Sequence, residues 1–261
     1  MKTLAASLSI LTQQGVMLYL LRGVAFTCII SVLGVILGLI VGSLLALART
    51  YCKHGPARVL GWLSAAYIEL FRNTPYLLWI FVCVVFCPCP AFFARKMFGL
   101  TSVEMKLLFK AALALILFNS SVIAEIVRGG LNGVSKGQFE AGYAQGFSYL
   151  QRMGYIILPQ SIPVMLPPMV NQVLNLFKNT SCLYIVGGAD LISVTYSFVT
   201  GASTGGAYAP AYIVCGVIFF VVCFPLSTLA ARWEASLKER KGRVNTSLKT
   251  AAKKVELKEA A

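Results

Sequence analysis

Two short polar segments interrupt apolar stretches of this sequence and carry side chains suited to binding a small anion. Residues 71–74 read FRNT and residues 177–180 read FKNT, so both follow the pattern F-[RK]-N-T. In each segment a cation lies beside an amide and a hydroxyl, and all three groups donate hydrogen bonds. Such a set suits a carboxylate, because a charged donor strengthens hydrogen bonds to a carboxylate. The candidate residues are Arg72, Asn73, Thr74, Lys178, Asn179 and Thr180.

The composition places these segments in a chain whose solvent is lipid. Hydrophobic residues make up 58% of the 261 residues and charged residues only 12%, with a mean hydropathy of +0.77. Soluble domains carry about 25% charged residues. Crossing about 30 Å of hydrocarbon takes about 20 apolar residues. The sequence has uncharged runs of at least that length at 23–48, 73–94, 153–177 and 191–231.

We therefore predict an all-α integral membrane protein with about five membrane-spanning helices. The spans are expected at about 18–48, 58–87, 106–127, 156–180 and 208–232. Pro75 should kink or break the second span, because proline removes a backbone donor. Gly34, Gly38 and Gly42 form a small-residue face on the first span, which would allow close packing between helices or between subunits.

Basic residues between the spans predict the orientation. Six lie in the loops after spans one and three and nine lie in residues 232–258, which gives 15 on one side against six on the other. Because the cytoplasmic side carries the excess of Lys and Arg, we expect the C-terminus in the cytoplasm and the N-terminus outside. The expected divisions are an amphipathic N-terminal segment (1–17), a membrane domain (18–235) and a basic tail (236–261) that contacts lipid rather than nucleic acid.

Charged residues inside spans are the candidates for a transport pathway. Such residues are costly in lipid and usually face a cavity or a partner. We expect Arg72 and Lys178 to face a translocation pathway or its gate. A structural reading also stands, in which Arg72 pairs with Glu69 and Lys178 extends to the outer interface. Glu125 and Arg128, at i and i+3, should form a structural pair at the inner end of span three.

The cytoplasmic loop between spans three and four, at 128–155, is too long for a simple connection and reads as functional. Phe139, Tyr143, Phe147 and Leu150 recur at a helical period, which predicts one apolar stripe. Gly146 should allow a bend between two short helices. A short helix with an aromatic stripe suits a groove on a partner protein. A helix lying on the membrane surface would have a more basic polar face.

This loop resembles a motif of permease subunits of ABC importers, E-A-x-x-x-x-G followed by I-x-L-P. The matching residues are Glu140, Ala141, Gly146, Ile156, Leu158 and Pro159. Gly142 stands where the family usually has alanine, which lowers helix propensity but keeps the residue small. Residues 67–79, 118–141 and 174–187 also resemble the polar amino-acid branch, and the resemblance covers about 20–235.

The resemblance implies a type I importer membrane domain with a coupling helix in this loop. The docking residues would be Phe139, Glu140, Ala141, Gly142, Tyr143 and Gly146. It implies two copies of a cytoplasmic ATPase, a second permease subunit in a homo- or heterodimer, and a periplasmic or lipid-anchored binding protein. The substrate would be glutamine, glutamate or aspartate, or alternatively cystine, arginine or histidine. The location would be the bacterial inner membrane.

No catalytic or metal-binding motif is present in the sequence. A GxxxxGK[ST] phosphate loop is absent, so ATP and magnesium are expected in the partner ATPase and no cofactor in this chain. His54 is the only histidine and HExxH does not occur. A secondary transporter is the remaining alternative, but five spans contain no evident inverted repeat.

Overall fold

The computed structural model describes residues 16–96, 101–188, 190–200 and 208–259, and every regular element in these ranges is helical. The helices are α2 (Val16–Tyr51), α3 (Arg58–Arg72), α4 (Tyr76–Phe86), α5 (Ser102–Asn132), α6 (Lys136–Ala144), α7 (Tyr149–Gln151), α8 (Leu158–Asn179), α9 (Leu191–Thr200) and α10 (Tyr208–Glu259). Short connecting helices are η1 (Gly55–Ala57), η2 (Ala91–Ala94), η3 (Arg152–Ile157) and η4 (Thr180–Val186). The expected segment 1–17 lies almost wholly outside the described residues.

The helices confirm the all-α membrane fold. Four helical stretches of the described chain are long and apolar enough to cross a membrane, and α3 with α4 makes a fifth if the pair counts as one span. The pair is bent by 109°, at the residues before α4 where Pro75 was expected to break the span. Thr74 stabilises the bend: its hydroxyl donates to the Leu70 carbonyl at 2.7 Å and accepts from the Trp79 indole at 2.6 Å.

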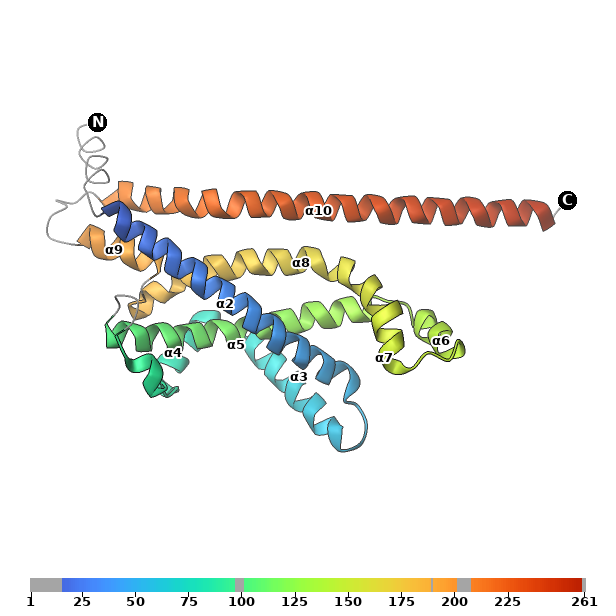
Figure 1. Ribbon diagram of the computed structural model, residues 1–261, viewed down its shortest axis with the longest axis horizontal. Helices are drawn as coiled ribbons and strands as arrows, with labels where there is room; N and C mark the ends of the chain where they lie inside the picture. The colour runs from blue at the N-terminus through green and yellow to red at the C-terminus, as the bar shows by residue number, and fades with distance from the viewer. Residues whose placement is uncertain (1–15, 97–100, 189, 201–207, 260–261) are drawn as a thin grey trace.

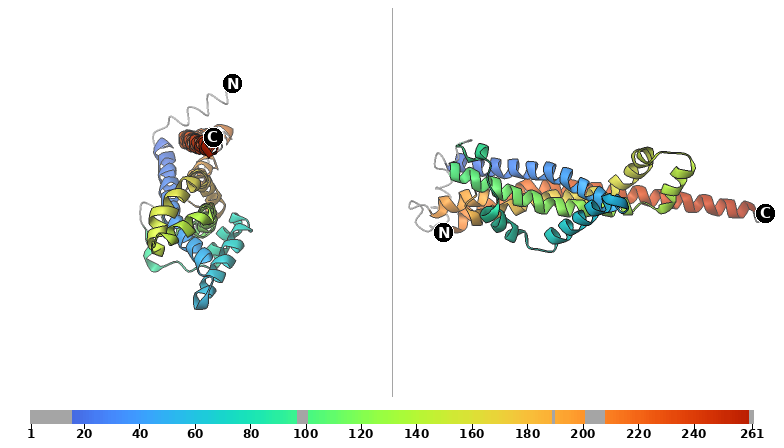
Figure 2. Two further views of the ribbon diagram at one scale, coloured as in Figure 1. Left: turned by 90° about the vertical axis from the view of Figure 1, so that its right-hand side faces the viewer. Right: turned by 90° about the horizontal axis from the view of Figure 1, so that it is seen from below.

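Helices α5, α8 and α10 run along the long axis, and α2 crosses them obliquely (Figure 1). Helices α6 and α7 lie at one end of the bundle and α9 lies at the other. Helix α10 continues past α6 and α7, and the right-hand view of Figure 2 shows its last turns leaving the bundle. The expected basic tail is therefore a continuation of the last span. We call the end that carries α6 the α6 end.

The glycine face of α2 packs inside the same chain, against α5. A Cβ atom added at Gly34 would lie 2.6 Å from Leu115, and one at Gly38 would lie 2.5 Å from Asn119. One at Gly42 would lie 2.7 Å from the backbone oxygen of Ser120. The sequence left open whether this face packs against another helix of the same chain or against a second subunit. The structure shows that it packs against another helix of the same chain.

Replacing Gly42 with leucine is expected to destabilise the protein by about 1–3 kcal/mol, the usual cost of overpacking. The reason is that the nearest atom to the new Cβ is backbone, which cannot rotate away as a side chain can. Thermal unfolding of the purified protein in detergent measures the effect. Gly129→Ala is the control, because nothing lies within 4 Å of its Cβ position. Equal melting temperatures for the two variants would contradict the packing argument.

A buried polar chain links three helices beside this face. Gln172 of α8 donates its amide to the Asn119 side-chain oxygen of α5 at 2.8 Å. Asn119 in turn donates to the Gly34 carbonyl of α2 at 3.3 Å. Both side chains are buried, and a hydrogen bond is worth most where water is absent. This polar chain fixes the register of α2, α5 and α8, and no local pattern of residues predicts it.

Helix α8 carries an unusual number of prolines. Pro159 lies in its first turn, and Pro163, Pro167 and Pro168 lie inside it. Each proline removes one i to i−4 hydrogen bond. The helix follows directly from η3, a six-residue π-helix, and π-helical turns are rare and concentrate at functional sites.

Candidate functional site

The loop between α5 and α8 folds into two short helices, α6 and α7, as the sequence predicts. Helix α6 ends in a Schellman motif: the Phe147 amide donates to the Gly142 carbonyl at 3.1 Å and the Gly146 amide to the Tyr143 carbonyl at 2.9 Å. Gly146 has a φ of +78°, a conformation that costs little only for glycine. Helix α7 then begins with a capping box between Ser148 and Gln151.

The predicted single apolar stripe is wrong, because α6 ends at Ala144 and its aromatic residues face different ways. Phe139 is half-buried against the cluster that contains Leu131 and Met153. Tyr143 is 73% exposed, and the Arg152 guanidinium lies 5.3 Å from the centre of its ring. Within α6, therefore, Phe139 anchors the loop on the bundle while Tyr143 lies on the outward side.

The outward surface of α6 contains most of the predicted docking residues. Glu140, Ala141, Tyr143 and Gly146 are exposed, and Glu140 has no ion pair with any residue that the structure describes. The exceptions are Phe139, which is half-buried, and Gly142, which is buried. A Cβ there would lie 2.8 Å from Ile156 and 2.9 Å from Arg152, so its small size serves packing of α6 on η3.

The loop is fixed to three long helices. Its buried core combines Leu131 of α5 with Met153 and Ile157 of η3 and Met165 of α8. Tyr149 meets Tyr51 of α2 edge to face, with ring centres 5.5 Å apart. Gln160 of α8 donates to Gln138 of α6 at 3.2 Å. A force applied to α6 is therefore passed to α2, α5 and α8 through packed side chains.

The supporting motif residues lie where the loop joins α8. Ile156 is partly buried and packs over Gly142. Leu158 and Pro159 open α8 directly after η3. The Leu158 amide donates to the Met153 carbonyl of η3, whereas Pro159 has no amide hydrogen to donate. These residues position α6 and are not part of its exposed face.

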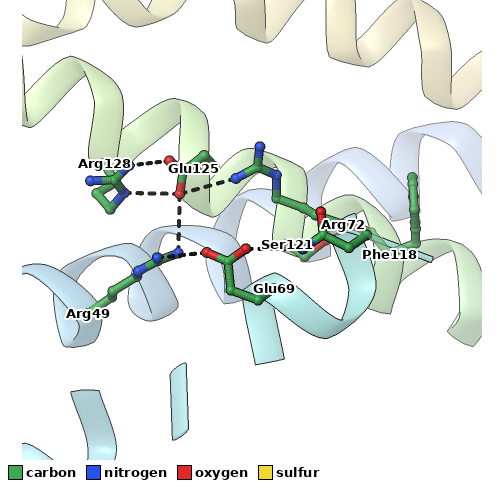
Figure 3. Close-up of polar contacts among 8 residues, drawn as sticks. Arg49, Glu69, Arg72, Phe118, Ser121, Glu125 and Arg128 are labelled. Carbon is green, nitrogen blue, oxygen red and sulfur yellow. Dashed lines mark hydrogen bonds and ion pairs between the residues drawn. The ribbon is translucent and has the colours of Figure 1, made fainter. Parts of the chain in front are cut away.

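Five charged side chains form one cluster between α2, α3 and α5 (Figure 3). Glu125 of α5 lies 3.4 Å from Arg49 and 3.5 Å from Arg72, and it also pairs with Arg128, whose Nε donates at 2.9 Å. Arg49 of α2 additionally pairs with Glu69 of α3 at 2.8 Å. Three arginines face two carboxylates, so the cluster carries one excess positive charge.

This cluster changes the structural reading of Arg72. The expected Glu125–Arg128 pair is present, but Arg72 forms its ion pair with Glu125 and not with Glu69. Asn73, the C-cap of α3, donates a hydrogen bond from its side-chain amide to the Glu69 carboxylate at 3.1 Å. The sequence did not predict that Arg49 pairs with Glu69 and Glu125. Arg49 entered the sequence analysis only as one of the basic residues of the loop after the first span.

The remaining pathway candidates, Thr74, Asn179 and Thr180, differ in burial and in hydrogen bonding. The Thr74 hydroxyl is engaged in the bend before α4. Thr180 is fully buried, and its hydroxyl donates to the Phe177 carbonyl at 2.8 Å. Asn179 ends α8 and is half-buried. Both threonine hydroxyls thus bond to the backbone of the preceding turn.

Lys178 lies on a cavity of about 390 Å³ between α8 and α10. From α8 and η4 the cavity is lined by Leu174, Lys178 and Ser181, and from α10 by Phe219, Phe220, Cys223, Phe224 and Ser227. The apolar stretch of α10 runs from Tyr212 to Leu237, so the residues from α10 lie at its middle. Lys178 is exposed and lies beside the middle of this apolar stretch. The phenylalanines were not singled out by the sequence, since they resemble ordinary lipid-facing residues.

Comparison with known proteins identifies the family. Residues 34–239 match the family described as binding-protein-dependent transport system inner membrane component. The chain is 41% identical over 170 residues to the probable glutamine ABC transporter permease protein GlnM of Bacillus subtilis (strain 168), covering 64% of this chain and 71% of that protein. It is 34% identical over 205 residues to the inner membrane amino-acid ABC transporter permease protein YhdY of Escherichia coli (strain K12), covering 78% of this chain but only 53% of that protein, or about half its length.

A solved structure has the same fold. It is described as the crystal structure of an amino acid ABC transporter with histidines, and it aligns with a TM-score of 0.66 at 24% identity over 84% of this chain and 94% of that one. The family match spans the glycine face of α2, the charge cluster, α6 and the Lys178 cavity. The chain belongs to the membrane-spanning permease components of binding-protein-dependent ABC transporters.

Proposed function

We propose that this chain forms the translocation pathway of an importer for a polar amino acid, with glutamine, glutamate and aspartate as the substrate class. ATP hydrolysis takes place in a separate cytoplasmic subunit. The observation that carries the proposal is α6: a short helix with an exposed Tyr143 and an exposed Glu140 that has no ion pair within the described residues, and whose inner side is packed onto α2, α5 and α8. An exposed face joined rigidly to a membrane bundle suits the transmission of motion from a partner.

The orientation follows from the same end of the molecule. The basic residues of the loops after α2 and α5, and those of the α10 tail, gather toward the α6 end. This end is proposed to face the cytoplasm, because short cytoplasmic loops carry the excess of Lys and Arg. The protein would then lie in the bacterial inner membrane with its N-terminus on the outer side.

The complete importer is proposed to contain two permease chains, two ATPase subunits and a binding protein that delivers the amino acid. Little of the α10 span is covered by its own chain, with only 6% of its most apolar window buried. Lipid or the second permease subunit would cover it. ATP binding would move the docked α6 helices and shift the bundle between two states. The substrate biases these states only by its difference in affinity for them.

The proposal is tested by reversing the charge of Glu140. Glu140→Arg is expected to reduce the amount of ATPase that copurifies with the chain, and to reduce ATP-driven glutamine uptake into proteoliposomes by at least about tenfold, as expected when a charged interface contact is lost. Lys106→Glu is the matched control, since Lys106 is exposed near the start of α5, at the other end of the bundle. Undiminished uptake by Glu140→Arg, or uptake by the chain without any ATPase, would overturn the proposal.

A further inference from the structure

An arginine without a polar partner lies across α6. Arg152, the first residue of η3, makes no ion pair in the described part of the chain, and its buried Nε has no hydrogen-bond partner there. Its guanidinium lies 5.3 Å from the centre of the Tyr143 ring, within the about 6 Å over which a π face attracts a cation. A buried donor without a partner is costly, so a guanidinium kept in this place indicates a role other than stabilising the loop.

The stem of Arg152 lies in a gap of α6 that a glycine provides. A Cβ atom added at Gly142 would lie 2.9 Å from Arg152 Cγ and 3.2 Å from its Cδ. The methylene groups of Arg152 therefore occupy the space that a side chain at position 142 would need. Because Tyr143 is the next residue of α6, a stem that crosses Gly142 brings the guanidinium to the Tyr143 ring.

The exposure of Tyr143 differs from what helical periodicity predicts. Tyr143 lies at i+4 from Phe139, and residues at this spacing are neighbours on one side of a helix. Phe139 is half-buried in the core of the loop, yet Tyr143 is 73% exposed. Arg152 fills the space between α6 and η3 beside the ring. The ring therefore lies outward, against a charged group, and does not pack inward as Phe139 does.

We propose that Arg152 is a positioning residue for docking: it holds the Tyr143 ring in the outward orientation in which the cytoplasmic ATPase binds it, and Gly142 leaves room for its stem. The inference rests on the proposed function and adds to it the pair of residues that prepares the docking surface before the partner arrives. Tyrosine is among the residues that supply most of the binding energy at interfaces. A side chain already held in its bound orientation loses less conformational entropy on binding.

A direct contact between Arg152 and the ATPase is the alternative that the test must separate. The two roles differ in how the effects of two substitutions combine. If Arg152 acts through Tyr143, removal of the ring leaves Arg152 nothing to position, so the two losses of affinity do not add. Two independent contacts with the ATPase would give additive losses.

The first test is therefore a double-mutant cycle on docking. The probe is the ATPase subunit that copurifies with the wild-type chain, titrated back onto the purified chain in nanodiscs. Arg152→Met keeps an unbranched stem but removes the cation, and it is expected to weaken binding about two- to fivefold, the factor for a cation–π contact at an exposed site. Tyr143→Leu should weaken binding more, and the double variant should bind as Tyr143→Leu does. Additive losses, or unchanged binding by Arg152→Met, would overturn the inference.

The matched control for this cycle is Arg95→Met. Arg95 is exposed directly after η2, which packs on α5 through the stacked rings of Phe93 and Phe109. It removes the same charge from a surface that is remote from α6, so binding of the ATPase should not change. An equal loss in Arg95→Met and Arg152→Met would show that net charge, and not the contact with Tyr143, governs the affinity.

Gly142 provides an independent check. Gly142→Ala is expected to weaken ATPase binding in the wild-type background but much less in Arg152→Ala, where the Cγ and Cδ atoms that the new methyl group would meet are gone. The other close neighbour, Ile156 Cδ1 at 2.8 Å, is the end of a flexible side chain and can rotate away. Equal losses in both backgrounds would contradict the proposed role of Gly142.

The second test observes Tyr143 without any ATPase. In a chain labelled with meta-fluorotyrosine, the fluorine NMR signal of residue 143 is the one that Tyr143→Phe removes. Arg152→Met and Gly142→Ala are both expected to shift and narrow this signal, because the ring loses its fixed contact and moves faster. Gly154→Ala in η3 should leave the signal in place, since nothing lies within 4 Å of its Cβ position. A signal unmoved by both variants would show that Arg152 does not hold the ring.

The two proposals fail in different ways. If the ATPase copurifies and drives glutamine uptake, but binds Arg152→Met as tightly as wild type, the positioning role is wrong and the importer assignment stands. If no ATPase copurifies with the wild-type chain, the proposed function fails and the docking role of Arg152 fails with it. An unchanged melting temperature of Arg152→Met shows that the variant is folded, so weaker binding is then attributable to the lost contact.

Discussion

Replacing Glu125 with glutamine is expected to lower the free energy of unfolding by about 2–3 kcal/mol, because it leaves three arginines facing one another with a single carboxylate between them. Glu125 pairs with Arg49, Arg72 and Arg128 and is 23% exposed. Partial exposure to solvent reduces the loss below the about 3–5 kcal/mol typical of a fully buried pair. Thermal unfolding in detergent, followed by tryptophan fluorescence, measures it.

Two variants serve as controls for this result. Glu140→Gln removes an exposed carboxylate that has no ion pair in the described residues, so its melting temperature should not change. Arg72→Met removes only one of the three cations and also relieves the excess positive charge, so its cost should be smaller than that of Glu125→Gln. A Glu125→Gln protein as stable as wild type would mean that water, and not Glu125, compensates the arginines.

Replacing Gly146 with valine is expected to uncouple ATP hydrolysis from transport. The φ of +78° at this position costs a β-branched residue about 1–2 kcal/mol. The Schellman bonds that end α6 would be lost or distorted, and α6 would no longer be held at a fixed angle to η3. Substrate-stimulated ATP hydrolysis in proteoliposomes should fall toward its basal rate, while the membrane bundle remains folded.

The matched control for this variant is Gly154→Ala in η3. Gly154 has no positive φ, and nothing lies within 4 Å of its Cβ position, so coupling should be retained. Limited proteolysis should detect a loosened loop in Gly146→Val but not in Gly154→Ala. Normal coupling in Gly146→Val would show that the angle of α6 is set by its partner and not by the Schellman motif.

Local signals predicted the local features of this fold. The uncharged runs located the spans, Pro75 marked the break before α4, and Gly146 marked the end of α6. Each of these depends on a few neighbouring residues and on the properties of lipid, glycine or proline. The i and i+3 spacing of Glu125 and Arg128 likewise sufficed to predict their pair.

Features that depend on how helices meet could not be predicted in the same way. Arg72 has Glu69 within one turn of its own helix, yet the bend after α3 brings it to Glu125 of α5 instead. The depth of Lys178 depends on which part of α10 packs against α8. The bond between Asn119 and Gln172 joins residues 53 positions apart. None of these contacts leaves a periodic or compositional trace in the sequence.

The prolines of α8 and the glycines of α2 give the two sides of the bundle different stiffness. The backbones of α2 and α5 approach closely at Gly42, where an added Cβ would lie 2.7 Å from the Ser120 carbonyl oxygen and 2.9 Å from Ile123, so the two helices should move as one rigid unit. Pro163, Pro167 and Pro168 have no amide hydrogen, so α8 lacks the backbone hydrogen bonds that other residues would donate at these positions. Helices bend most easily at such points. Helix α8 runs from the α6 loop to Lys178. A displacement of α6 should therefore bend α8 and change the shape of the cavity, while α2 and α5 stay straight.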